Sequence, residues 1–261
     1  MMAYPDIDPV ALNLGFLKIH WYGISYVVGI SAAWLLLRFR GSQIHWGFSS
    51  EQVSDLVFYA MVGIIIGGRL GSVLFYNFPQ YLEHPLDVFK IWQGGMSFHG
   101  GLLGVIAAMI WFARKTESGT FKVLDFIAPV VPIGLGCGRI GNFINGELWG
   151  APSDLPWAMI FPNAGALPRH PSQLYEAFLE GLILFIILWL FSAKPRPTMS
   201  IAGLFLLGYG VFRFAVEFVR IPDSHIGYLA FDWLTMGQIL SFPMIMVGTV
   251  LFIMAYRIKE H

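Results

Sequence analysis

The chain has 261 residues, of which 56% are hydrophobic and only 12% are charged. Soluble domains carry about a quarter charged residues, so this composition, with a mean hydropathy of +0.65, predicts a polytopic membrane protein. The formal net charge is zero, which leaves no basic surface for nucleic acid. The single cysteine, Cys137, excludes an internal disulfide and a cysteine-rich metal site, and the seven histidines lack the spacing of a zinc motif.

Seven apolar stretches are long enough to cross the hydrocarbon of a bilayer as helices, which takes about 20 residues each. In chain order they are Ile19–Leu37, Val53–Tyr76, Met96–Ala113, Val123–Phe143, Gln173–Phe191, Ile201–Phe218 and Met236–Tyr256. The sequence lacks the alternating segments of a transmembrane β-barrel. It therefore predicts an all-α polytopic membrane protein with about seven transmembrane helices. Because no linker, low-complexity tract or repeat breaks the chain, we expect residues 1–261 to form a single integral membrane domain.

Basic residues are distributed unequally between the two sides of these spans. One set of loops carries nine, namely Arg38, Arg40, Arg114, Lys115, Lys122, Lys194, Arg196, Arg257 and Lys259. The opposite set carries four, namely Lys18, Lys90, Arg169 and Arg220. Since the more basic loops face the cytoplasm, we expect a periplasmic N-terminus and a cytoplasmic C-terminus. Residues 144–171 and 219–235 are then expected to form small periplasmic caps.

With this orientation, the polar side chains of six spans gather at one depth, near the outer leaflet. They are His20, Tyr22, Arg69, Tyr76, Ser97, His99, Arg139, Asn142, Gln173, Tyr175, Glu176, Tyr209, Arg213 and Glu217. A charge within the membrane is costly and usually faces a cavity or a partner. We therefore predict one polar cavity that opens outward. Its three arginines and few carboxylates make it attractive to an anion.

Some of these residues also fit purely structural roles. Arg213 and Glu217 are four residues apart, the spacing of an ion pair within a helix. His20 and Tyr76 suit the aromatic belt at the membrane interface, and Arg69 can extend its side chain toward that interface. Gly63, Gly67 and Gly71 are spaced for close helix packing. In contrast, His99 lies among flexible glycines, which favours a functional role.

The stretch "GCGRIGNFINGELWG", Gly136–Gly150, combines glycines with four polar side chains at the end of an apolar span. It matches the spacing G-x-G-x-x-G, but a dinucleotide site needs a preceding strand in a βαβ unit. Here the context is a membrane helix, so that interpretation is rejected. The glycines instead allow the backbone and neighbouring helices to approach a ligand closely.

The part Gly138–Gly150 resembles the signature of bacterial prolipoprotein diacylglyceryl transferases. The resemblance continues in order along nearly the whole chain, through "HWYG" at His20–Gly23, "GGRLG" at Gly67–Gly71, "GGMSFHGGL" at Gly94–Leu102, "RHPSQLYE" at Arg169–Glu176, and "GYGVFRF" with Glu217 at Gly208–Glu217. It implies an enzyme of the bacterial cytoplasmic (inner) membrane that acts toward the periplasmic face. The implied reaction moves the diacylglyceryl group of phosphatidylglycerol to the lipobox cysteine of a preprolipoprotein, giving a thioether and glycerol phosphate.

The resemblance also implies which residues matter, and elementary chemistry agrees with it. The important arginines of the family correspond to Arg139 and Arg213 and its important histidine to His99, while Tyr22, Asn142, Glu147 and Tyr209 occupy other positions of interest. Arginine forks bind phosphate by paired hydrogen bonds. A base whose pKa lies near neutrality, such as histidine, can deprotonate and so activate a thiol, whose own pKa is about 8.5.

We therefore expect His99, Arg139 and Arg213 to be catalytic. The residues expected to bind substrate are Tyr22, Arg69, Tyr76, Asn142, Asn145, Glu147, Tyr209 and Glu217. No metal or cofactor is expected, and the expected partners are phosphatidylglycerol, the preprolipoprotein signal peptide and membrane lipid. The main alternative is a transporter of an anionic solute. It would need a polar path to the cytoplasm, and the inner halves of the spans are apolar.

The predicted orientation can be tested by cysteine labelling in a Cys137→Ala background. Asp154→Cys should react with an impermeant thiol reagent in intact spheroplasts, because residue 154 is expected outside. Lys194→Cys should not react, because it lies in a loop of the more basic set. The reverse labelling would overturn the orientation and, with it, the placement of the polar cavity near the outer leaflet.

Overall fold

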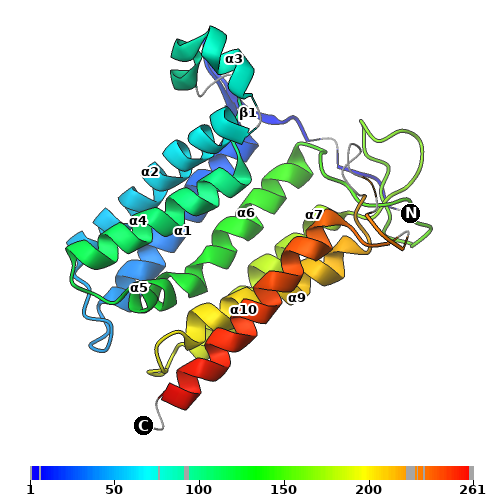
Figure 1. Cartoon of the computed structure of the whole chain (residues 1–261). Helices are drawn as coiled ribbons and strands as arrows, with labels where there is room; N and C mark the ends of the chain where they lie inside the picture. Colours follow the sequence, from blue (N-terminus) through cyan, green and yellow to red (C-terminus); the bar gives the residue numbers. More distant parts are fainter. Residues whose placement is uncertain are drawn as a thin grey trace. The chain divides into compact units, whose positions relative to one another are not determined.

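The fold is described from a computed structural model, which describes residues 2–5, 7–75, 77–90, 94–221, 227, 229–231 and 233–258 (Figure 1). The chain divides into two compact units. The larger comprises Met1–Leu36 with Asp125–His261, and the smaller comprises Leu37–Leu124.

Helices make up most of the described chain. Six are long and apolar enough to cross a membrane, namely Trp21–Gly41, Ser50–Phe75, Thr120–Ile144, Ser172–Phe191, Ser200–Glu217 and Met236–Ile258. These helices confirm the predicted all-α polytopic membrane fold. The remaining predicted span corresponds to α4 (Phe98–Lys115), an 18-residue helix with Arg114 and Lys115 in its last turn. The count of seven, the orientation and the single domain stay predictions.

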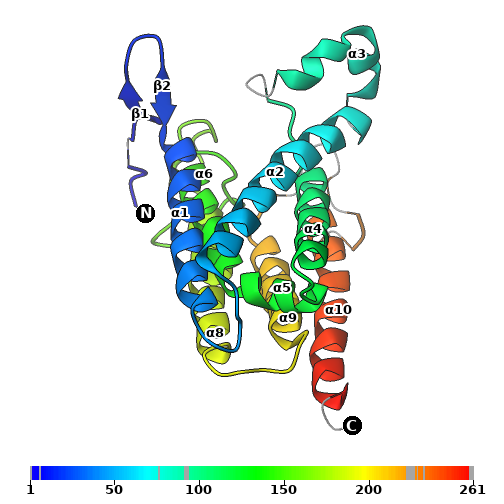
Figure 2. The same cartoon turned by 90° about the vertical axis from the view of Figure 1, so that its left-hand side faces the viewer.

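The larger unit begins with a β-hairpin that leads directly into α1 (Trp21–Gly41) (Figure 2). Strands β1 (Val10–Asn13) and β2 (Lys18–His20) pair antiparallel, with Leu12 opposite Ile19 and an irregularity between residues 10 and 12. Gly15, at φ +81°, supplies the left-handed conformation that the turn needs.

The next span of this unit is interrupted by prolines. It consists of α5 (Thr120–Ile127), the short 3₁₀ turn η3 (Ala128–Val130) and α6 (Val131–Ile144). Pro129 lacks the N–H that a continuous α-helix would use, which accounts for the 3₁₀ turn there. Pro132 lies in the first turn of α6, where a missing N–H costs little.

The following span contains a π-helical segment. It runs through α7 (Ser172–Glu176), the π-helical η4 (Ala177–Ile183) and α8 (Leu184–Phe191). A Cβ added at Gly181 would lie only 2.8 Å from the Cα of Gly136. The two glycines therefore let the backbones of η4 and α6 touch.

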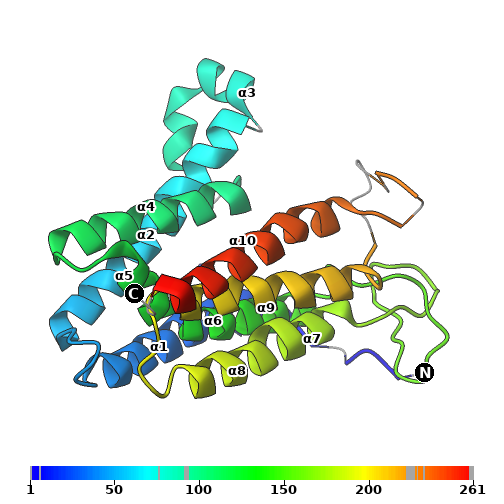
Figure 3. The same cartoon turned by 60° about the horizontal axis from the view of Figure 1, so that its bottom comes forward.

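Helices α9 (Ser200–Glu217) and α10 (Met236–Ile258) lie side by side (Figures 1 and 3). Their contact also depends on glycine, because a Cβ at Gly248 would meet the backbone nitrogen of Leu207 at 2.5 Å. At the start of α9, the buried Asp125 accepts backbone hydrogen bonds from Met199 and Ala202, each at 2.7 Å. This carboxylate satisfies N–H groups that would otherwise lack partners at a helix N-terminus.

The segment between α6 and α7 is ordered and packed. Met159 and Arg169 exchange backbone hydrogen bonds, and Phe161 is fully buried. The backbone of Gly150 donates to the carbonyl of His170, at a position where a Cβ would lie 2.4 Å from the carbonyl oxygen of Val219. The location of this segment as a periplasmic cap stays a prediction. In the second expected cap, 219–235, residues 222–226, 228 and 232 lie outside the described residues.

The smaller unit contains α2 (Ser50–Phe75), α3 (Phe78–Glu83), the 3₁₀ turn η1 (Pro85–Phe89) and α4. Helices α2 and α4 lie side by side (Figures 1 and 2). A Cβ at Gly104 would lie 2.0 Å from the carbonyl oxygen of Gly63, and one at Gly67 would lie 2.3 Å from that of Gly100. The predicted close packing through the glycines of α2 is therefore confirmed.

Candidate active site

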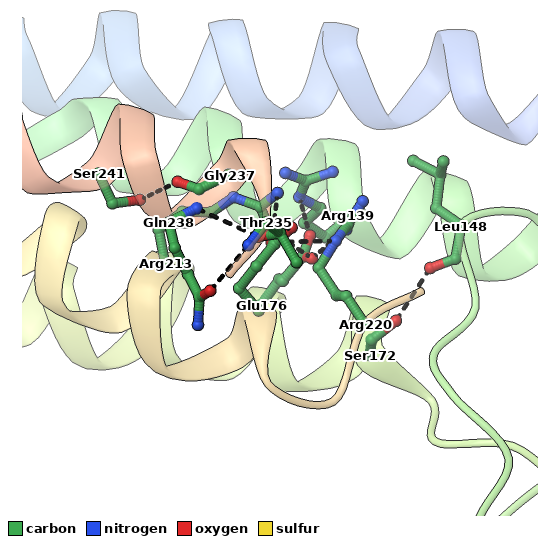
Figure 4. A network of polar contacts seen from close by, with 11 residues as sticks. Arg139, Leu148, Ser172, Glu176, Arg213, Arg220, Thr235, Gly237, Gln238 and Ser241 are labelled. Atoms are coloured by element: carbon green, nitrogen blue, oxygen red, sulfur yellow. Dashed lines mark hydrogen bonds and ion pairs between the residues drawn. The ribbon is translucent and has the colours of Figure 1, made fainter. Parts of the chain in front are cut away.

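The larger unit holds a cluster of arginines around one buried carboxylate (Figure 4). Glu176, the last residue of α7, has a side chain with no exposed surface. Its Oε2 lies 2.5 Å from Nε of Arg139 on α6, and its Oε1 lies 3.1 Å from Nη1 of Arg213 on α9. Nη1 of Arg220, just after α9, also donates to Oε1. One carboxylate thus orients three guanidinium groups from separate parts of the chain.

A second carboxylate supports the same arginines. Oε2 of Glu217 lies 2.8 Å from Nη2 of Arg213 and 3.4 Å from Nε of Arg220. The hydroxyl of Thr235 donates to its Oε1 at 3.0 Å. Gly237 leaves space for this carboxylate, because a Cβ there would lie 2.5 Å from Oε1. The ion pair expected from the spacing of Arg213 and Glu217 is therefore present.

The ion pairs of the cluster join more guanidinium groups than carboxylates. Among the described residues, three guanidinium groups lie within ion-pair distance of two carboxylates, Glu176 and Glu217, so these pairs leave one positive charge in excess. Among the described residues, the two Nη atoms of Arg139 have no ion-pair or hydrogen-bond partner, and its side chain is 22% exposed. These donors point away from Glu176 in Figure 4. They form a planar fork of the kind that binds phosphate by two parallel hydrogen bonds.

The end of α6 forms a second polar group. Asn142 Nδ2 donates to Oε1 of Glu147 at 2.8 Å, and Asn145 Nδ2 donates to the same oxygen at 3.3 Å. Gly146, at φ +63°, makes the turn that brings Glu147 back toward these amides. Gln173 Nε2 donates to the carbonyl of Glu147 at 2.5 Å and ties the turn to α7. The structure thus brings the predicted Asn142, Asn145 and Glu147 together.

A cavity of about 610 Å³ adjoins this turn. Its lining residues are Lys18, Ile19, His20, Tyr22, Gly23 and Asn145. The hydroxyl of Tyr22 lies 3.0 Å from that of Tyr26. A Cβ at Gly141 would lie 2.9 Å from the Tyr22 ring, so this glycine allows α1 to approach α6. The predicted Tyr209 lies on α9, with its ring stacked on Phe205 at 6.0 Å between centroids.

His170, just before α7, was not predicted as a site residue. Trp157 Nε1 donates to the hydroxyl of Tyr175 at 2.8 Å, and that hydroxyl lies 3.2 Å from Nδ1 of His170. Burial lowers the pKa of His170 from its usual value because the charged imidazolium loses hydration. This burial favours the neutral form of the His170 imidazole.

The smaller unit contains the other predicted residues. His99 is exposed in the first turn of α4, and the Ser97 side chain caps that turn by accepting from the backbone of Gly100 at 3.2 Å. Tyr76 lies outside the described residues. Within the described ranges, no group of three His, Cys, Asp or Glu side chains is arranged to hold a metal ion.

Arg69, which was expected to bind substrate, hydrogen-bonds to backbone carbonyls. Its side chain is buried, and every N–H of its guanidinium donates to a backbone carbonyl in the smaller unit. The acceptors are Val88 at 2.8 Å, Gly94 at 2.5 Å, Gly95 at 3.0 Å, Lys90 at 3.3 Å, and Asp87. Arg69 therefore organises the chain around η1 and has no N–H left for a phosphate.

The site also contains residues that sequence reasoning missed. Glu176 was recognised as polar but not assigned to the site, and Arg220 was assigned to an outer loop. Two features of the sequence could have indicated that Glu176 belongs to the site. It is a carboxylate at the start of an apolar span, and arginines outnumber carboxylates at the same predicted depth. Arg220 follows Glu217 by three residues, which is an ion-pair spacing in a helix.

The model of the prolipoprotein diacylglyceryl transferase family matches residues 9–254. The chain belongs to this family. It is 63% identical over 257 residues to the phosphatidylglycerol–prolipoprotein diacylglyceryl transferase of Methylococcus capsulatus, covering 98% of each chain. It is 60% identical over 257 residues to that of Pseudomonas paraeruginosa, covering 98% of this chain and 97% of the relative. The family predicted from the sequence motifs is thereby confirmed.

The contribution of the buried Glu176 carboxylate to stability can be tested with the variant Glu176→Gln. Removing one partner of a buried ion pair leaves uncompensated charge and costs about 3–5 kcal/mol. We expect the free energy of unfolding, measured in detergent micelles, to fall by about that amount. The matched control is Asp55→Asn, which removes a half-exposed carboxylate 3.3 Å from Lys115. Exposed pairs contribute about 0–1 kcal/mol, so equal losses in both variants would contradict the assigned role.

Proposed function

We propose that this chain transfers the diacylglyceryl group of phosphatidylglycerol to the lipobox cysteine thiol of a preprolipoprotein. The products are a thioether-linked lipid and glycerol phosphate. The single observation that carries the proposal is the arginine cluster, in which, among the described residues, three guanidinium groups pair with two carboxylates and the two Nη atoms of Arg139 are unpaired. Relatives that are 58–63% identical over nearly the full chain and are named for this reaction support it.

Phosphatidylglycerol carries one phosphate, and the cluster has one positive charge in excess. We assign Arg139 to the phosphate, because its Nη atoms are unpaired among the described residues and its Nε is held by Glu176. Arg213 is held by both Glu176 and Glu217, so its guanidinium is fixed before substrate arrives. Fixed donors at the position where negative charge develops are a large catalytic contribution, because they need no reorganisation during the reaction.

The chemical step is a displacement at carbon. The thiolate sulfur attacks the glyceryl carbon, the carbon–sulfur bond forms, and the carbon–oxygen bond to phosphate breaks. The electron pair of the broken bond leaves with the phosphate oxygen, where the arginines stabilise it. The thiol proton passes to a base, for which we assign His99. Its exposed position in the first turn of α4 leaves the ring accessible to an incoming group.

The remaining assignments concern the peptide and the membrane. We assign Asn142, Asn145 and Glu147 to the headgroup and the incoming lipobox, because their side chains converge at the end of α6. Tyr22 lines the adjoining cavity with Asn145. We further propose that the enzyme resides in the bacterial inner membrane and works at its periplasmic face, as the distribution of basic residues favours. A transporter is not favoured, because relatives 60–63% identical are named for the transferase reaction and the predicted inner halves of the spans are apolar.

The proposed reaction is tested with purified protein, phosphatidylglycerol and a lipobox peptide, following the peptide by mass spectrometry. We expect the peptide to gain the mass of a diacylglyceryl group. A peptide whose lipobox cysteine is replaced by serine is the control and should stay unmodified. Persistent absence of lipid on the cysteine peptide, with folded protein, would reject the transferase assignment.

Arg139→Lys separates charge from geometry at the proposed phosphate site. Lysine keeps the positive charge but lacks the planar fork that grips phosphate and Glu176 together. We expect most of the activity to be lost, a fall of about 100-fold or more, while the protein still inserts and folds. Arg114→Lys, at an exposed position of α4, is the matched control and should stay near normal. Near-normal turnover of Arg139→Lys would remove the phosphate assignment.

His99→Asn tests the assignment of the base through the pH dependence of the rate. We expect low activity at neutral pH that partly recovers as the pH rises through about 8.5, where a free thiol ionises without help. The rate is measured from about pH 6.5 to about pH 9.5, alongside the unchanged protein. A deficit that stays constant across this range would show that His99 positions substrate and does not accept the proton.

A further inference from the structure

One further carboxyl group lies beside the arginine cluster and has no role in the reaction described above. Glu180 lies in the π-helical segment η4, four residues after Glu176, so the two side chains share a face of the span. Its side chain has no exposed surface. Within the part of the chain that the structure describes, neither of its carboxyl oxygens has a hydrogen-bond partner.

The partners that would stabilise an ionised Glu180 are already committed. The charged groups that act on it are Glu176 on α7, Arg139 on α6, and Arg213 and Arg220 on or just after α9. Among the described residues, the ion pairs of these arginines are with Glu176 and Glu217, and none is with Glu180. Tyr209 is the other titratable group that faces it, and α8 contributes only apolar side chains.

An isolated ionised carboxylate is very costly to bury without hydrogen bonds, and such groups take up a proton instead. The neighbouring Glu176 adds like-charge repulsion to this cost. Both effects favour the neutral acid at position 180. A neutral Glu180 preserves the excess positive charge of the cluster, because three guanidinium groups then face two carboxylates. An ionised Glu180 would make the numbers equal and abolish the excess.

We propose that Glu180 holds a proton in the resting protein and thereby keeps the arginine cluster one positive charge in excess, matched to a phosphodiester monoanion. Glu180 is thus a positioning residue, which acts through the arginines and does not touch the substrate. This inference rests on the proposed function only for the identity of the anion as phosphatidylglycerol. The π-helical segment supports it, because such segments within α-helices are frequently found at functional sites.

The first test is spectroscopic and needs no turnover. Infrared difference spectra of the purified protein, recorded across a pH titration, should contain the C=O stretch of a protonated carboxylic acid. That band should be missing in Glu180→Gln and present in Asp154→Asn, which removes an exposed carboxylate from the same unit. If the band is missing in the unchanged protein, or persists in Glu180→Gln, the proposal is overturned.

The second test measures lipid binding without the peptide substrate. Quenching of tryptophan fluorescence by brominated phosphatidylglycerol in micelles gives the affinity from about pH 6.5 to about pH 9.5. In the unchanged protein we expect the affinity to fall with rising pH, by up to about tenfold per pH unit once Glu180 ionises. In Glu180→Gln the affinity should not follow pH in this way. Brominated phosphatidylcholine, with no net headgroup charge, should lack the pH dependence in both proteins.

Further outcomes also decide the question. Glu180→Met is the second variant, because it fills similar space and cannot ionise. If both variants fold but keep the pH dependence of the unchanged protein, Glu180 does not set the charge of the cluster. If neither variant folds, or neither binds the lipid at any pH, an ionised carboxylate is required and the proposal fails. Absence of diacylglyceryl transfer alone would reject the proposed function and would leave the infrared result intact.

Discussion

The burial of one carboxylate among three arginines is the constraint on which the larger unit depends. Charges within a membrane-spanning region need partners, and Glu176 supplies them for α6, for α9 and for the chain just after α9. The glycines serve the same constraint. Gly136 and Gly181 let two spans touch near the cluster, and Gly237 leaves room for the carboxylate of Glu217. Backbone approach and charge pairing are therefore two aspects of one arrangement.

Most of the fold follows from the sequence, because the membrane imposes a simple rule on composition. An apolar stretch of about 20 residues must satisfy its own backbone hydrogen bonds, which only a helix does within one segment. The bounds of α9 and α10 accordingly differ from expectation by two residues or fewer at each end. The internal irregularities were less accessible. The proline-linked turn at Ala128–Val130 follows from Pro129, whereas the π-helical segment has no comparable signal in its residues.

The site residues were predicted from their polarity and from the family resemblance, but the pairings between them were predictable only where the contacts are local. The pair Arg213 and Glu217 follows from a spacing of four residues on one helix. The contact between Glu176 and Arg220 joins residues 44 positions apart, and no periodicity reports such a pairing. Arg69 illustrates the converse case. Its charge within a span suggested a ligand, but its donors satisfy backbone carbonyls of a nearby loop, which a sequence pattern does not reveal.

The π-helical segment Ala177–Ile183 determines how the fifth predicted span tolerates changes of length. Each residue of an α-helix advances about 100° around the axis, and a π-helical turn accommodates one residue more. The segment therefore sets the rotational phase between Glu176 and the buried Leu184 and Leu188 of α8. A single deletion inside it restores an α-helix and leaves both faces in phase. The same deletion in α8 before Leu188 would rotate Leu188 away from the face that carries Glu176. We therefore expect natural variation in the length of this span to occur within residues 177–183.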